Sequence, residues 1–116
     1  MVMALVAVAM MAQQPVITFE KTDHDFGKIN EADGKVTTIF TFKNEGMEPL
    51  VLSNVRASCG CTTPSWTKEP VMPGQTGTIK VRYNTNNVGG FTKTITVTSN
   101  AINSPRITLK IKGKVE

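Results

Sequence analysis

The stretch that decides the fold reads TGTIKVRY and spans residues 76–83. Its apolar and polar residues alternate: Ile79, Val81 and Tyr83 share one face, and Thr78, Lys80 and Arg82 share the other. Successive side chains of a β-strand point to opposite faces, so this pattern predicts a strand with one buried and one solvent-facing side.

Similar stretches rich in β-branched and aromatic residues recur along the chain, and none has a sustained helical period. The expected strands are residues 16–19, 24–29, 36–42, 50–55, 76–83, 91–98 and 106–115. Turn residues such as Asp33-Gly34 and Pro73-Gly74 separate them. Residues 56–75 have weak periodicity and are expected to form a long loop. About seven short antiparallel strands with this spacing predict an all-β, immunoglobulin-like sandwich.

The composition limits the classes of protein that the chain can belong to. It has 116 residues, of which 40% are hydrophobic and 19% charged, with a formal net charge of +4. These values exclude a disordered chain and a collagen-like chain. They also exclude most large enzyme architectures, because a barrel or a doubly wound sheet needs far more residues. We therefore expect one domain over residues 13–116.

The first twelve residues, MVMALVAVAMMA, carry no charged side chain. A membrane-spanning helix needs about 20 apolar residues, so this run is too short to span a bilayer. Its length fits the apolar region of a secretory signal peptide, with Ala12 or, alternatively, Ala9 before the cleavage site. No Lys or Arg precedes the run, which is compatible with a truncated signal whose true start lies upstream. The alternatives are a buried first strand or an N-terminal extension. We expect an exported protein, periplasmic or secreted.

Several motifs occur in an order that is typical of one bacterial family. They are Asp25-Phe26-Gly27-Lys28-Ile29, Phe40 to Gly46 (FTFKNEG), Pro49 to Leu52 (PLVL), Ser58-Cys59-Gly60-Cys61-Thr62, Pro73-Gly74 and Thr94 to Asn100 (TITVTSN). In these motifs the chain resembles the family known as domain of unknown function fifteen-seventy-three, over roughly residues 17–115. The resemblance implies an immunoglobulin-like fold related to major-sperm-protein-like domains, and a location in the envelope of Bacteroidetes-type bacteria. It implies no established activity, so no catalytic residue is carried over.

Cys59-Gly60-Cys61 is the strongest candidate for chemistry. Two thiols one residue apart can close a small disulfide, and a disulfide is the expected state in an oxidising compartment. They can instead supply two ligands to Cu(I) or Zn(II), although zinc would need further ligands. They can also act as a thiol-redox pair, or remain reduced as small packing groups. The spacing differs from the two-residue gap of thioredoxin-like centres.

The charge distribution and one aromatic residue supply candidate binding residues. Lys110, Lys112 and Lys114 share a face of the last expected strand and could contact an anionic surface. Alternatively they protect an edge strand from pairing with other chains. Trp66 is either a core residue below the long loop or an exposed anchor for a partner. Nucleic acid is not an expected partner, because no aromatic residue interleaves with these lysines.

The sequence is compatible with two functions. The first is an exported, non-catalytic interaction or structural module of the cell envelope, which binds another envelope protein or a glycan. The second is a metal-binding or thiol-redox protein that uses Cys59 and Cys61. An enzyme is not expected, because no Ser–His arrangement or carboxylate pair can be assembled from the motifs. No cofactor and no transmembrane span are expected, and the oligomeric state stays open.

Overall fold

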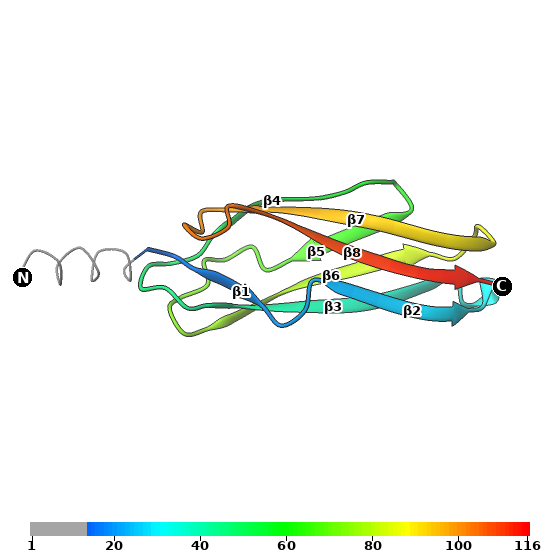
Figure 1. Cartoon of the computed structure of the whole chain (residues 1–116), viewed down its shortest axis with the longest axis horizontal. Helices are drawn as coiled ribbons and strands as arrows, with labels where there is room; N and C mark the ends of the chain where they lie inside the picture. The colour runs from blue at the N-terminus through cyan, green and yellow to red at the C-terminus, as the bar shows by residue number, and fades with distance from the viewer. Residues whose placement is uncertain (1–13) are drawn as a thin grey trace, which may run out of the picture.

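Eight strands form two packed sheets in the computed structural model, which describes residues 14–116 (Figure 1). The strands are β1 (Ile17–Phe19), β2 (Asp23–Ile29), β3 (Lys35–Asn44), β4 (Leu52–Ala57), β5 (Thr62–Trp66), β6 (Thr76–Asn84), β7 (Gly89–Ser99) and β8 (Arg106–Val115), with a short 3-10 helix η1 (Glu31–Asp33). The expected signal segment, residues 1–12, lies outside the described residues. The predicted immunoglobulin-like β-sandwich is confirmed.

Each sheet has four strands. The first sheet has the order β1-β3-β6-β5 and the second sheet the order β2-β8-β7-β4. All neighbours pair antiparallel except β2 and β8, which are parallel. The prediction of antiparallel strands throughout was wrong for this pair. After β1 the chain leaves the first sheet and joins the second as β2, beside the C-terminal strand.

The core lies between the sheets. It is formed by the side chains of every second residue along the strands, which point inward. Phe40, Ile79 and Val81 of the first sheet and Leu109 and Ile111 of the second are all fully buried. Removing one such side chain from water stabilises the fold by about 1.5–3 kcal/mol. The alternation read from residues 76–83 thus places the core correctly.

The last strand is not an edge strand, as the sequence suggested it could be. β8 lies between β2 and β7, and its backbone groups pair on both sides. Protection of an edge therefore does not explain the lysines on its outer face. The edges of the second sheet are β2 and β4.

Two boundaries also differ from the expected ones. The segment 56–75, expected to be a loop, contains β5, whose Pro64 is accommodated because β5 is an edge strand. The strand expected to begin at Leu50 begins at Leu52, while Leu50 forms an isolated bridge with Val71. Across residues 14–116, no helix has the length and apolar character needed to span a membrane.

Candidate functional site

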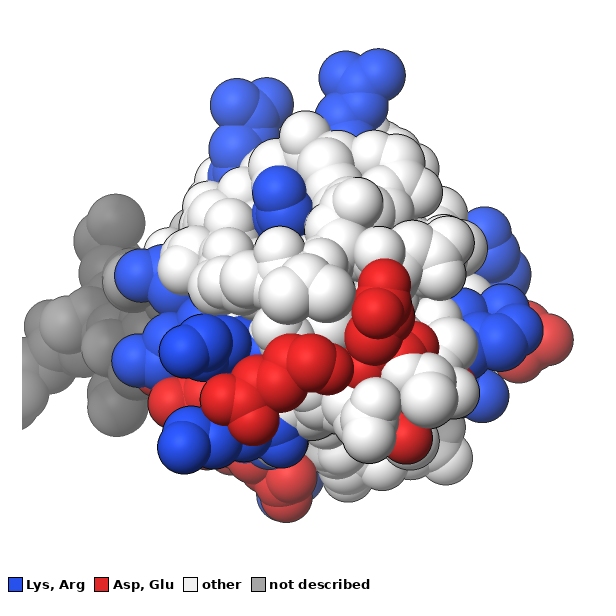
Figure 2. Space-filling model, turned by 90° about the vertical axis from the view of Figure 1, so that its right-hand side faces the viewer, with Lys and Arg blue, Asp and Glu red and all other residues white. Residues whose placement is uncertain are grey.

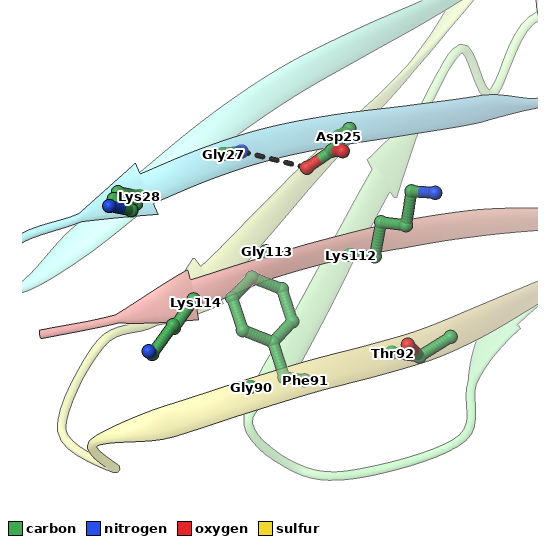
Figure 3. A pocket seen from close by; sticks show the side chains of 9 residues that line it. All are labelled: Asp25, Gly27, Lys28, Gly90, Phe91, Thr92, Lys112, Gly113 and Lys114. Carbon is green, nitrogen blue, oxygen red and sulfur yellow. Dashed lines mark hydrogen bonds between the residues drawn. The ribbon is translucent and has the colours of Figure 1, made fainter.

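A shallow hollow of about 540 Å³ lies on the outer face of the second sheet, over β2, β8 and β7 (Figure 3). We call it the lysine hollow. It is lined by Asp25, Gly27, Lys28, Gly90, Phe91, Thr92, Lys112, Gly113 and Lys114. Two of the lysines predicted from the sequence, Lys112 and Lys114, are therefore part of it.

Strand register explains why these residues meet. Asp25 and Thr92 pair with Lys112 from its two sides, so the three form one row across the sheet. In the next outward-facing row, Lys28 and Gly90 pair with Lys114 in the same way. Gly90 has no side chain, so the surface is recessed between the lysines.

A β-bulge in β2 brings Lys28 into the hollow. The register between β2 and β8 shifts between Asp25 and Lys28, where Gly27 has a φ of 68° that favours glycine. Strict alternation from Asp25 would place Lys28 on the inner side of the strand. The bulge instead pairs Lys28 with Lys114 and leaves Ile29 partly buried against the core. Sequence reasoning missed Lys28, although a glycine within a strand is a signal for a bulge.

The hollow has a positive charge balance. Lys28, Lys112 and Lys114 are exposed, and Asp25 is the one acidic residue among the described residues that line it. Asp25 Oδ1 accepts a hydrogen bond of 2.8 Å from the N–H of Gly27 (Figure 3). That carboxylate therefore also supports the bulge. Three ammonium groups beside one carboxylate form a surface that favours an anion.

Two other predicted binding residues lie elsewhere. Lys110 is exposed in the next row along β8, where its neighbours are Asp23 and Thr94. It is not among the residues that line the hollow. Trp66 lies on β5 of the first sheet, partly buried against the core, and Lys68 Nζ lies 3.4 Å from its ring centroid. The structure therefore does not bring Trp66 together with the lysines.

Cys59 and Cys61 are joined by a disulfide in the connection between β4 and β5. Metal binding by the two sulfur atoms would first require reduction of this bond. Over residues 14–116, no three His, Cys, Asp or Glu side chains are grouped so that they could hold a metal ion. In the chain-entropy model, a loop this short contributes only about 1.5 kcal/mol to stability.

His24 lies far from the cysteines in the topology. It is on β2, an edge of the second sheet, whereas the cysteines follow β4, the opposite edge of that sheet. Its ring packs edge-on against Phe26, and Lys21 Nζ lies 2.8 Å from its Nδ1. Partial burial and the nearby Lys21 lower the pKa of His24. His24 is not among the residues that line the lysine hollow.

A second hollow, of about 250 Å³, lies beside the disulfide, and we call it the disulfide hollow. It is lined by Gly34, Lys35, Gly60, Cys61, Thr63, Arg82 and Asn84. Lys35 pairs with Asn84 across β3 and β6, and Arg82 pairs with Thr63 across β6 and β5. This hollow is therefore on the outer face of the first sheet, away from the lysine hollow.

Comparison with protein families identifies the chain. The model of the family described as "Protein of unknown function (DUF1573)" matches residues 17–115. The chain belongs to this family. The resemblance inferred from the order of the motifs is thus confirmed. A search of curated proteins finds no match for this DUF1573 domain.

Solved structures share the fold of the DUF1573 domain at low sequence identity. A protein of unknown function from Porphyromonas gingivalis W83 is 20% identical with a TM-score of 0.77, and the match covers 90% of this chain and 48% of that one. The ASH/PapD-like domain 7 of human CEP192 is 7% identical with a TM-score of 0.71, covering 91% and 87%. A chain of the CsuC–CsuE chaperone–tip adhesion subunit complex of Acinetobacter baumannii is 11% identical with a TM-score of 0.61, covering 87% and 57%.

These comparisons assign a PapD-like, immunoglobulin-like fold to the domain. The chain spans about half the length of the Porphyromonas protein. A family of unknown function and a PapD-like fold are compatible with a non-catalytic interaction module.

Proposed function

We propose that this DUF1573 domain is an exported, non-catalytic interaction module of the bacterial cell envelope. In this proposal its lysine hollow binds an acidic segment of another envelope protein. The observation that carries the proposal is that Lys28, Lys112 and Lys114 line one recessed surface, on which Asp25 supplies the one carboxylate among the described lining residues.

Charged side chains of both signs lie at the end of the molecule that bears the C-terminus (Figure 2). Viewed from the end that bears the C-terminus, acidic side chains gather on the lower part of the molecule while Lys and Arg side chains lie around the periphery (Figure 2). Main-chain hydrogen bonds from Glu31 N–H to Glu116 O and from Glu116 N–H to Ile29 O bring η1 and the C-terminal residue together. A surface of mixed sign favours recognition at the hollow over general attraction to any anion.

The lining favours a protein segment over a glycan. Phe91 is the aromatic residue among the described lining residues, and it is only 9% exposed, with its ring stacked on Tyr83. It therefore presents little aromatic surface to a sugar ring. Lysines and Thr92 offer donors to carboxylates instead. In the CsuC–CsuE complex, the same fold occurs in an assembly of a chaperone with an adhesion subunit.

Two features of the chain support export. The uncharged segment of residues 1–12 has the length of the apolar region of a signal peptide. A disulfide between Cys59 and Cys61 is typical of an oxidising compartment such as the periplasm.

Titration calorimetry with a ten-residue Asp/Glu-rich peptide tests the function. We expect binding that is weakened about tenfold in the double variant Lys112→Gln/Lys114→Gln, because two charge contacts are lost. The control Lys43→Gln/Lys80→Gln removes the same charge from the outer side of the first sheet and should bind like the wild type.

Polygalacturonate serves as the second probe. Binding of polygalacturonate but not of the peptide, with the same dependence on Lys112 and Lys114, would replace the protein partner with an acidic glycan. Equal binding of either probe to both double variants would show that the lysine hollow is not the site.

A further inference from the structure

The Cys59–Cys61 disulfide has no role in the proposed function and faces a different surface. It closes a ring that includes only Gly60 between the two cysteines, and Cys61 lines the disulfide hollow. Both cysteines are partly exposed. The disulfide therefore lies near the surface, beside this hollow.

The hollow in front of the bond carries two cations. Lys35, Asn84 and Cys61 form one row across the first sheet, since Lys35 pairs with Asn84, and Asn84 N–H donates to Cys61 O at 2.9 Å. Arg82 lies in the adjacent outward-facing row between Thr37 and Thr63. None of the described residues that line the hollow is acidic. A small anion in the hollow would therefore be held next to Cys61.

The two sulfur atoms have different surroundings. The N–H of Cys61 donates a hydrogen bond of 3.1 Å to Cys59 Sγ. The hydroxyl of Thr62 lies 3.9 Å from Cys59 Sγ and 3.8 Å from Cys61 Sγ, and Thr62 is buried. A thiolate on Cys59 would keep the main-chain donor. Cys59 is accordingly the better leaving group and Cys61 the better target, because hydrogen bonding favours the charged form.

We propose that Cys59–Cys61 is a thiol–disulfide exchange site for a small anionic thiol, one that carries a carboxylate or sulfonate group. The anionic group binds between Lys35 and Arg82. The thiolate of the small thiol attacks Cys61 Sγ, a new sulfur–sulfur bond forms, and the Sγ–Sγ bond breaks with its electron pair on Cys59.

A second molecule of the thiol completes the reaction. Its thiolate attacks the small-thiol sulfur of the mixed disulfide, and Cys61 leaves as a thiolate. Two small thiols are then oxidised to one symmetrical disulfide and the protein disulfide is reduced to two thiols. The two protons that the small thiols release on ionising pass through solvent to Cys59 and Cys61. The reverse sequence reoxidises the protein.

The fold can tolerate both redox states. The buried core consists of apolar residues between the sheets, and the connection is also held by Asn84 N–H to Cys61 O and by Ser58 N–H to Thr94 O, at 2.9 Å each. These hydrogen bonds involve backbone atoms and do not require the disulfide. Reduction can therefore occur without unfolding.

The test compares the rates at which 2-mercaptoethanesulfonate and neutral 2-mercaptoethanol reduce the protein. In the double variant Lys35→Gln/Arg82→Gln, we expect the rate constant for the sulfonate thiol to fall about tenfold and that for mercaptoethanol to change less than twofold. The control Lys43→Gln/Lys110→Gln has the same net charge and should react like the wild type. Thermal melting confirms that each variant is folded.

A second measurement uses the wild type alone. Acid quenching early in the reaction, maleimide labelling at low pH and tandem mass spectrometry locate the adduct. We expect the small thiol on Cys61 and the label on Cys59. An adduct mainly on Cys59, or an equal loss of rate with both thiols in the double variant, would overturn the proposal. Neither result affects the lysine hollow, so failure here is distinct from failure of the proposed interaction function.

Discussion

Two of the connections that carry the chain from one sheet to the other are held in different ways. Residues 45–51 lead from β3 to β4, and residues 58–61 lead from β4 to β5. The first is held by Asn44, which is fully buried. The second contains the partly exposed Cys59–Cys61 disulfide.

Asn44 makes hydrogen bonds with the backbone of two loops. Its Oδ1 accepts from Gly46 N–H at 2.9 Å, and its Nδ2 donates to Glu48 O at 2.7 Å and to Val71 O at 2.9 Å. These are buried or partly buried groups that need partners. We therefore expect the non-covalent connection to contribute more to stability than the covalent one, which closes a short loop next to solvent.

The largest effect is expected from Asn44→Ala. The change leaves Gly46 N–H and two carbonyl groups without this partner, so the free energy of unfolding should fall by about 3 kcal/mol. Urea denaturation measures this value. Asn54→Ala, on the exposed side of β4, is the control and should cost less than about 0.5 kcal/mol. If Asn44→Ala lowered the free energy of unfolding by less than about 1 kcal/mol, the first connection would not be the more strongly stabilised of the two.

A glycine substitution in each connection gives the next largest effect. A Cβ at Gly46 would meet main-chain atoms, namely Gln14 O and Val16 N, whereas a Cβ at Gly60 has nothing within 4 Å. Gly46→Ala should lower the free energy of unfolding by about 2 kcal/mol because the backbone must move. Gly60→Ala should leave it nearly unchanged. Thermal melts of the two variants check this pair, and equal shifts would contradict the assignment of roles.

The smallest effect is expected from Cys59→Ser/Cys61→Ser. Loss of a disulfide that closes so short a loop should cost about 1.5 kcal/mol in the free energy of unfolding. Binding of the acidic peptide at the lysine hollow should be unchanged, since neither cysteine lines that hollow. Urea denaturation and calorimetry measure the two quantities. A loss as large as that of Asn44→Ala would show that the disulfide is a structural support.

Much of the fold could be predicted, because it depends on local alternation. Ile79, Val81 and Leu109 are buried, and Lys112 and Lys114 are exposed, as their positions in the pattern require. The strand β5 was missed because it contains a proline and few apolar residues, so it shows no clear alternation of apolar and polar side chains. The parallel pairing of β2 with β8 was missed because the local sequence of a strand does not show which sheet the strand joins.

The candidate sites could be predicted only in part. Lys112 and Lys114 were identified from their shared face, but Lys28 was not, because the bulge at Gly27 changes the direction of its side chain. Cys59 and Cys61 were identified from their spacing. Lys35 and Arg82 lie far from them in the sequence, and only the pairing of β3, β6 and β5 brings them to the same hollow.

The all-β class, the buried face of most strands and the family follow from the amino-acid sequence. Each of these depends on residue type and on the alternation of apolar and polar residues with a period of two. A short segment of the chain is enough to show both. The tertiary structure decided that β8 is an inner strand, that Lys28 joins Lys112 and Lys114, and that the disulfide lies beside two cations. These arrangements depend on which strands pair and in which register, and that choice is made by packing between segments distant in sequence.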